Sequence, residues 1–379
     1  MNRRNIITVI LAPYILFGLY IIYEGSNSLT SNRFYYLEHA MLWDIFGIFL
    51  LFVVSRINYK FFVRISTYLL IFLIFAIIFT IFKGQSINGA TRWIVVKGIT
   101  IQPSEFIKPV IILYFAGILE KGRTVGGNVL SKLTIPFTSI LLLVSLLTLY
   151  QKDLGTTIII IIISISIYFL YIERPKQLYQ LLLILSIFLA LAVVAIIIEP
   201  YRLERILTYS SSQTSNSLGS GYQLKQILIT IGSGGLFGKG IGYNIGKTPF
   251  LVQGTSITDS AFAIIAQELG FFLTTLFLIY FIAIISLLYY IALTIKDYQG
   301  KAIFITIVIL IFFQSIINIF VNLNILPLTG IPLPLISYGG SSTISIFLSL
   351  GLIYSIIYFD DKEKDTSDRR SLYKRTKHS

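Results

Sequence analysis

Residues 158–172 read IIIIIISISIYFLYI, and two further runs, 6–22 (IITVILAPYILFGLYII) and 68–82 (YLLIFLIFAIIFTIF), are equally free of charge. A helix of about 20 apolar residues crosses the hydrocarbon core of a bilayer and satisfies its own backbone hydrogen bonds there. With their flanking residues these runs reach that length. They predict an integral membrane protein.

The overall composition favours the same class. Of the 379 residues, 55% are hydrophobic and 12% are charged, whereas soluble domains carry about 25% charged residues. The net charge of +13 raises the question of a nucleic-acid partner, but Lys and Arg lie mainly between and after the apolar runs. We therefore expect membrane lipids, and no nucleic acid, to meet these charges. With no cysteine and only His39 and His378, the chain has no thiolate nucleophile and no His or Cys metal cluster.

The apolar runs predict an all-α, polytopic fold with ten transmembrane helices. We place these spans at 6–24, 40–54, 65–82, 104–119, 134–150, 156–172, 178–198, 262–294, 302–323 and 342–359. The eighth run is long enough to be strongly tilted, to start outside the hydrocarbon, or to be two helices. Arg3 and Arg4 before the first run resemble a signal peptide, but no small-residue cleavage site follows, so we expect a retained span.

Lys and Arg fall in alternate connections, and such connections face the cytoplasm. The cytoplasmic set is Arg3, Arg4, Arg56, Lys60, Arg64, Lys121, Arg123, Lys132, Arg174, Lys176, Lys296 and Lys301. This pattern puts both termini of a multi-pass protein of the cell (cytoplasmic) membrane in the cytoplasm. Residues 1–359 then form a single transmembrane domain, and the mixed charges of 360–379 predict a disordered cytoplasmic tail.

The segments left for the outer side are 25–39, 83–103, 151–155, 199–261 and 324–341. The largest of them, the extracytoplasmic loop 199–261 between the seventh and eighth spans, is too long to be a mere connector. We expect the functional residues on this side of the membrane.

Ionisable groups at membrane depth often mark a substrate path. Glu105 and Lys108, three residues apart, share one face at the start of the fourth span. They form either a structural ion pair or, with Arg92, a site for a diphosphate.

Two outer aspartates have alternative roles. Asp153 lies in the hairpin between the fifth and sixth spans, where it either caps the sixth helix or faces a cavity formed by the other outer segments. Asp259 lies where a polar loop meets the eighth span. Partial desolvation there would raise its pKa and suit a general base, and the rival role is again a helix cap.

Two outer stretches are rich in glycine or proline. The string 231–242, with Lys239, lacks the ending of a nucleotide-binding loop, and its glycines instead permit tight turns and close approach to a lipid diphosphate or to the membrane surface. The three prolines within 324–342 prevent a continuous helix, and this segment is either a structural plug or a binding surface.

These motifs together resemble the FtsW/RodA family, the shape, elongation, division and sporulation proteins. The resemblance is carried by LPLTGIPLPLISYGGSS at 326–342, QPSE at 102–105 and GSGGLFGKG at 232–240. It implies a peptidoglycan glycosyltransferase that polymerises lipid II into glycan outside the membrane, releases undecaprenyl diphosphate and works with a class B penicillin-binding transpeptidase.

The resemblance also implies roles for single residues. Asp259 matches the family's essential outer-loop aspartate and would be the catalytic base. Substrate-binding roles fall to Arg92, Glu105, Lys108, Asp153, Lys239, Ser337 and Tyr338. The chain departs from the family pattern at three positions: Lys152 replaces a usual proline, Thr91 a residue that is often basic, and Gln267 a common glutamate.

In the implied reaction, Arg92 and Lys108 would stabilise the departing diphosphate, with Lys239 or a loosely bound divalent cation (Mg or Mn), and no metal site is expected on the protein. A lipid II flippase is the main alternative, although a transporter's polar sites lie near the membrane midplane. A scaffold that only recruits the transpeptidase would not need the outer aspartate.

Overall fold

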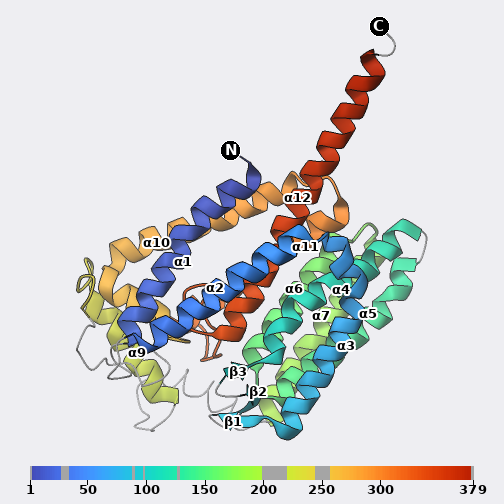
Figure 1. The fold of residues 1–379 in the computed structure, drawn as a ribbon. Helices are drawn as coiled ribbons and strands as arrows, with labels where there is room; N and C mark the ends of the chain where they lie inside the picture. Colours follow the sequence, from blue (N-terminus) through green and yellow to red (C-terminus); the bar gives the residue numbers. More distant parts are fainter. Residues whose placement is uncertain are drawn as a thin grey trace.

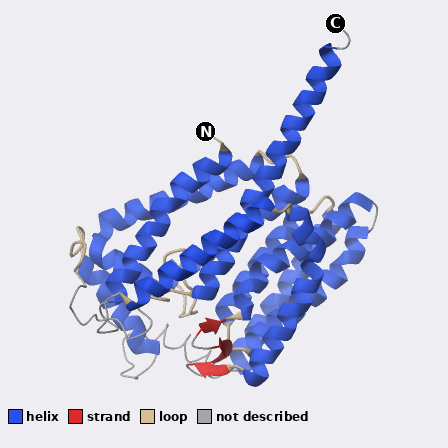
Figure 2. Cartoon of the chain, in the orientation of Figure 1, coloured by secondary structure: helices blue, strands red, loops and turns tan. Residues whose placement is uncertain are grey.

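The structure, a computed structural model, describes residues 2–26, 34–87, 90–96, 99–125, 129–198, 220–243 and 257–376. The helices are α1 (Arg3–Ser26), α2 (Tyr35–Arg56), α3 (Tyr59–Lys83), α4 (Pro103–Val125), α5 (Val129–Tyr150), α6 (Leu154–Leu170), α7 (Pro175–Ile198), α9 (Ser220–Gly234), α10 (Ala261–Leu293), α11 (Tyr298–Asn322) and α12 (Gly340–Thr376), and the strands are β1 (Gln85–Ile87), β2 (Ala90–Val96) and β3 (Ile99–Ile101). Long helices run side by side and the strands lie at one end of the bundle (Figures 1 and 2).

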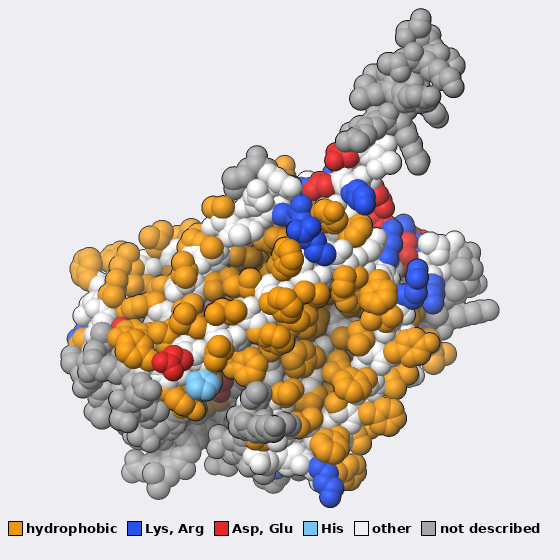
Figure 3. Space-filling model, in the orientation of Figure 1, with side chains coloured by type: hydrophobic (Ala, Val, Ile, Leu, Met, Phe, Trp, Pro, Cys, Tyr) orange, Lys and Arg blue, Asp and Glu red, His pale blue; other side chains and the backbone are white. Residues whose placement is uncertain are grey.

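Each of the ten predicted spans coincides with one of these helices, which confirms the all-α, polytopic class. In the described part of the chain, six helices meet the length and hydropathy needed to cross a membrane, namely α1, α2, α3, α10, α11 and α12. On the face drawn in Figure 3, hydrophobic side chains cover the flank of the bundle. Independently of this view, Phe72 and Phe75 of α3 each have about two thirds of their surface exposed. Such a flank is suited to lipid and unsuited to water.

The eighth span is broken but does not reverse. Gly270 interrupts α10 with φ 67° and ψ −175°. The antiparallel helix α1 contacts both pieces of α10: Tyr20 donates to Glu268 before the break, and Tyr280 after the break donates to the Ile10 carbonyl. Both pieces therefore run in the same direction, and the C-terminus stays at the N-terminal end of the bundle.

The N-terminus and α12 meet at this end. Arg3 of α1 forms an ion pair of 2.7 Å with Asp360 of α12, and the labelled termini lie at the same end of the molecule (Figure 1). Lys60 pairs with Asp297 in the same region at 3.4 Å. The basic connections of the sequence therefore gather at this end, which we call the basic end.

The structure adds a small sheet that the apolar runs did not predict. The outer segment 83–103 contains an antiparallel sheet with strand order β1-β2-β3, in which Ser86 faces Thr91 and Ile94 faces Ile101. Alternating and β-branched residues in β2 favour a strand once turns bring partners alongside. Sheet pairing of this kind is non-local, so the search for apolar runs of spanning length does not reveal it.

At the C-terminal side, where the mixed charges predicted a disordered tail, α12 continues through residues 360–376 as helix. Forming the first turn of a helix is the unfavourable step, and the membrane-spanning part of α12 has already formed it. Each further residue of the tail therefore extends the helix with one added hydrogen bond. The pair of Asp360 with Lys364, four residues apart at 3.2 Å, supports this extension.

Candidate functional site

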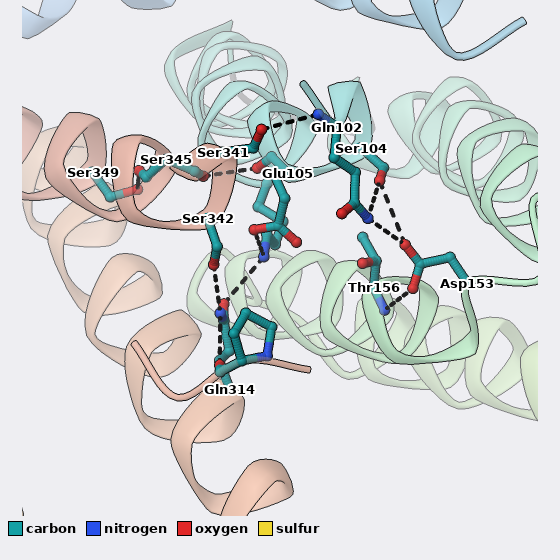
Figure 4. A network of polar contacts seen from close by, with 12 residues as sticks. Gln102, Ser104, Glu105, Asp153, Thr156, Gln314, Ser341, Ser342, Ser345 and Ser349 are labelled. Atoms are coloured by element: carbon teal, nitrogen blue, oxygen red, sulfur yellow. Dashed lines mark hydrogen bonds and ion pairs between the residues drawn. The ribbon is translucent and has the colours of Figure 1, made fainter. Parts of the chain in front are cut away.

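Asp153 is locked into the end of the bundle opposite the basic end. Its carboxylate accepts from the Thr156 amide at 3.2 Å and so caps α6. Gln102 donates to it at 2.9 Å, and Ser104 lies 3.5 Å away (Figure 4). Asp153 is almost fully buried; of its two alternative roles, one oxygen makes the cap of α6, while the other accepts from Gln102 at the start of α4.

Arg92 of β2 extends this cluster. A guanidinium nitrogen lies 3.6 Å from an Asp153 oxygen, and the side chain donates to the carbonyls of Gln151 and Lys152 in the hairpin. Lys152 has φ 60°. A proline, which the family pattern usually has at this position, cannot adopt that angle because its ring fixes φ at about −65°. Arg92 therefore holds a hairpin whose backbone differs from that of a proline-containing one.

Glu105 and Lys108 form a buried ion pair next to this cluster. The Lys108 Nζ lies 2.7 Å from Glu105 and donates to the Gln314 side-chain oxygen at 3.1 Å. Both charged side chains are at most 5% exposed. Ser345 of α12 donates to the Glu105 carbonyl at 2.7 Å, and Figure 4 shows how α4, α11 and α12 converge on the pair. Burying two charges is costly, so three helices meet here to satisfy them.

Asp259 lies at the junction of α10, α11 and the segment 324–339. Its backbone carbonyl accepts from Asn318 and Asn322, both at 2.9 Å. A Cβ built on Gly330 would lie 3.7 Å from an Asp259 carboxylate oxygen. The side chain is half-buried, and the N-cap position of α10 belongs to Ser260. Asp259 therefore differs from the fully buried cap Asp153.

The proline-rich segment connects these parts. Gly155 of α6 approaches so closely that a Cβ there would lie 3.0 Å from the Thr329 carbonyl. Ser337 is buried and accepts from the Leu333 amide at 2.9 Å, while the Tyr338 amide donates to the Ile257 carbonyl at 2.8 Å. Ser337 thus holds a turn of the segment, and Tyr338 ties the segment to the loop that carries Asp259.

Lys239 stands apart from the other predicted site residues. It is exposed, and its amide donates to the Gln267 carbonyl at the break in α10. A Cβ on Gly270 would lie 2.1 Å from the Gly238 amide nitrogen, and both residues have positive φ, so glycine is required at both positions. The close approach predicted for the glycine string is therefore one between two protein backbones. Of the loop 199–261, residues 199–219 and 244–256 lie outside the described ranges.

Four functional candidates were missed by sequence reasoning: Gln102, Gln314, Asn318 and Asn322. The last three follow each other at intervals of four along α11 and are fully buried, so they share one face of that helix. Gln314 binds Lys108 and Asn318 binds the Asp259 carbonyl, and four residues of helix correspond to about 6 Å. Amides spaced four residues apart within an apolar run are the sequence signal that could have identified these three residues.

Among the described residues, no three His, Cys, Asp or Glu side chains are grouped in a way that would hold a metal ion. The charged side chains of the site are the cations Lys108 and Arg92, the buried carboxylates Glu105 and Asp153 that pair with them, and the half-buried Asp259, with several amides and hydroxyls around them. This set can bind an anionic group at Lys108 and accept a proton at Asp259.

Comparison with known proteins identifies the family. The profile of the FtsW/RodA/SpoVE cell cycle proteins matches residues 4–362. The chain is 33% identical over 345 residues to the probable peptidoglycan glycosyltransferase FtsW of Buchnera aphidicola subsp. Baizongia pistaciae (strain Bp), covering 89% of this chain and 86% of that protein. It is 32% identical over 359 residues to stage V sporulation protein E of Bacillus subtilis (strain 168), covering 93% and 95%.

Solved structures agree on the fold. RodA of Thermus thermophilus superposes with a TM-score of 0.65 at 22% identity, covering 93% of this chain and 95% of that one. A chain of a solved peptidoglycan synthase complex, described as coordinating polymerization and crosslinking, gives a TM-score of 0.75 at 22% identity, covering 93% and 97%. The chain therefore belongs to the FtsW/RodA/SpoVE family and is a multi-pass membrane protein with the family's helical fold.

Proposed function

We propose that this protein is a peptidoglycan glycosyltransferase that polymerises lipid II into glycan strands. The observation that carries the proposal is that one face of α11 contacts both groups: Gln314 accepts from the buried Lys108, and Asn318, one turn further along, binds the backbone carbonyl of the half-buried Asp259. Relatives over most of the chain are named probable peptidoglycan glycosyltransferases.

In the proposed reaction, the 4-hydroxyl of the acceptor's N-acetylglucosamine attacks the anomeric carbon of the donor's muramic sugar. The bond from that carbon to the diphosphate breaks with inversion, and undecaprenyl diphosphate leaves. A sugar hydroxyl is a weak nucleophile, so Asp259 takes its proton as the new bond forms.

The departing diphosphate gains charge where little water is present, and fixed cations stabilise it there. Lys108 is the proposed primary cation, since an ammonium has three donors and the contacts to Glu105 and Gln314 use two of them. Arg92 is already engaged with the hairpin and Asp153, so it acts at the edge of the site. Glu105 and Asp153 orient the two cations, and a divalent cation carried by the diphosphate would add to their effect.

The exposed position of Lys239, together with its backbone contact at the α10 break, favours a role at the membrane surface over direct contact with the diphosphate. Ser337 and Tyr338 support the segment beside Asp259, and we propose that the substrate passes over this segment.

The decisive experiment incubates the purified full-length protein in lipid nanodiscs with lipid II and measures glycan polymer on a gel. Asp259→Asn keeps the shape of the side chain and removes the base, so polymerisation should fall by roughly 10²–10⁴-fold. The matched control is Asp361→Asn at the basic end, which should polymerise normally. Absence of polymer from the wild-type protein, together with lipid II transfer across vesicles, would favour the flippase alternative.

We also propose that the basic end faces the cytoplasm and that a class B penicillin-binding transpeptidase binds this protein in the membrane. The chain has no cysteine, so single cysteines report topology without background. A membrane-impermeant maleimide should label Lys152→Cys in intact cells and leave Lys362→Cys unlabelled. The reverse pattern would invert the topology.

A further inference from the structure

Unpartnered polar atoms gather around Asp259. The Ser260 hydroxyl, the Asn322 and Asn324 amide oxygens and the Thr329 hydroxyl are all buried without a hydrogen-bond partner. Leaving a buried polar group unpaired costs about 1–3 kcal/mol, and native proteins rarely tolerate several in one place. Four of them in the residues that follow, hold or adjoin Asp259 and its α11 partner Asn322 require an explanation.

Three of these residues are tied to Asp259, and the fourth, Asn324, follows Asn322 by two residues at the end of α11. Ser260 is its chain neighbour and occupies the N-cap position of α10 without making a capping bond. The Asn322 amide nitrogen donates to the Asp259 carbonyl at 2.9 Å, which leaves the orphaned oxygen on the same side-chain amide. Thr329 directly precedes Gly330, where a Cβ would lie 3.7 Å from an Asp259 carboxylate oxygen.

The chemistry of the four groups selects a ligand class. Two amide oxygens can only accept hydrogen bonds, and two hydroxyls can both donate and accept. A phosphate offers only acceptor oxygens, so it does not match the amide oxygens. A sugar with several hydroxyls and an acetamido N–H supplies donors for all of them.

We infer that Ser260, Asn322, Asn324 and Thr329 form a subsite that binds the hydroxyl and acetamido groups of the acceptor amino sugar beside Asp259. The inference rests on the proposed function and divides the site between the two substrates. The acceptor sugar binds at Asp259, next to Asn318, and the donor diphosphate binds at Lys108, next to Gln314, one turn away along α11. The acceptor then supplies the hydrogen bonds that these buried atoms lack.

The test replaces single orphaned hydroxyls in the full-length protein in nanodiscs. Thr329→Val is nearly isosteric and removes only the hydroxyl, and Ser260→Ala does the same at the N-cap. Because each hydroxyl is unpaired, its loss should leave the melting temperature unchanged or raise it. The loss of one hydrogen bond to substrate should raise the KM for lipid II by roughly three- to tenfold, with a smaller change in kcat.

Thr274→Val is the matched control. Thr274 of α10 also has a buried hydroxyl without a partner, but it lies four residues beyond the helix break and outside the proposed subsite. This variant should keep the wild-type KM and share the stability effect.

A second measurement does not depend on turnover. Lipid II should raise the melting temperature of the wild type and of Thr274→Val, and raise it less in Thr329→Val and Ser260→Ala. This result would support the subsite even if no polymer formed, which separates it from failure of the proposed function. An equal rise in all four proteins, as expected if water alone fills the subsite, or no rise in the wild type, would overturn the inference.

Discussion

Helix α4 carries the same acid–base spacing at both of its ends. Glu105 and Lys108 are three residues apart with their charges 2.7 Å apart, and Glu120 and Arg123 are three residues apart at 3.1 Å. The first pair is almost fully buried, whereas the side chains of Glu120 and Arg123 are 19% and 32% exposed. Local sequence geometry is thus equal at the two ends, and the environment differs.

The difference separates two uses of an ion pair. A surface pair contributes little and costs little, while a buried pair must be compensated by its surroundings because both ions lose their hydration. Gln314 and the helices α11 and α12 supply that compensation at Glu105–Lys108. At the basic end, Arg123 instead packs over the Tyr298 ring at 4.1 Å. Because burying both charges of Glu105–Lys108 costs desolvation free energy, we assign a functional role to this pair and not to Glu120–Arg123.

The largest expected effect is that of Lys108→Ala. It leaves the Glu105 carboxylate buried without its cation, a change that typically costs about 3–5 kcal/mol. Polymerisation per folded molecule should fall as well, because the proposed diphosphate cation is gone. Protein level and melting temperature in nanodiscs, followed by activity at matched protein, measure both effects.

Arg123→Ala is the control for that variant, since it makes the same change at the other end of α4. Its cost should stay near 1 kcal/mol, and activity should be unchanged. If Lys108→Ala lowers only protein level and keeps full activity per molecule, the buried pair is structural and the diphosphate is bound elsewhere.

Glu105→Gln should have the next largest effect. The amide keeps the shape and one acceptor for Lys108, so stability should fall by about 1–3 kcal/mol and activity less than in Lys108→Ala. A double-mutant cycle with Glu105→Ala and Lys108→Ala measures the coupling between the two side chains. Additive losses in the cycle would mean that the two charges act independently, contrary to the geometry.

Much of this contrast follows from sequence. Ten apolar runs predicted ten helices, and the spacing of Glu105 and Lys108 predicted a shared face, because helix periodicity is local. The burial that distinguishes this pair from Glu120–Arg123 depends on α11 and α12, more than 180 residues away in the chain. The same applies to the β1–β3 sheet, whose pairing is non-local, and to the link between Asn318 and Asp259.

The variant Asp153→Asn compares the two outer aspartates, Asp153 and Asp259. Asp153→Asn keeps an acceptor for the Thr156 amide, and Asn caps helices about as well as Asp. The charge facing Arg92 and the second acceptor, which takes the Gln102 hydrogen bond, are lost, so we expect a stability loss of about 1–3 kcal/mol and a change in activity of only a few-fold. A loss approaching that of Asp259→Asn would give Asp153 a direct part in the chemistry.

The smallest effect should come from Glu120→Gln, the counterpart of Glu105→Gln. The two hydrogen bonds from Arg123 to Glu120, at 3.1 and 3.3 Å, raise the pKa of the guanidinium, but arginine is charged at any pH a folded protein tolerates, so that shift adds no pH dependence. The pair is partly exposed to water, and Arg123 keeps its stacking on Tyr298 in the variant, so the stability cost should be a few tenths of a kcal/mol.

The salt dependence of the melting temperature tests the contrast directly, because salt screens exposed charges and leaves buried ones largely unaffected. The difference in melting temperature between wild type and Glu120→Gln should shrink between low and high NaCl, while the difference caused by Glu105→Gln should persist. Equal salt sensitivity at both ends of α4 would show that water reaches Glu105 and Lys108, and the contrast between the two pairs would then fail.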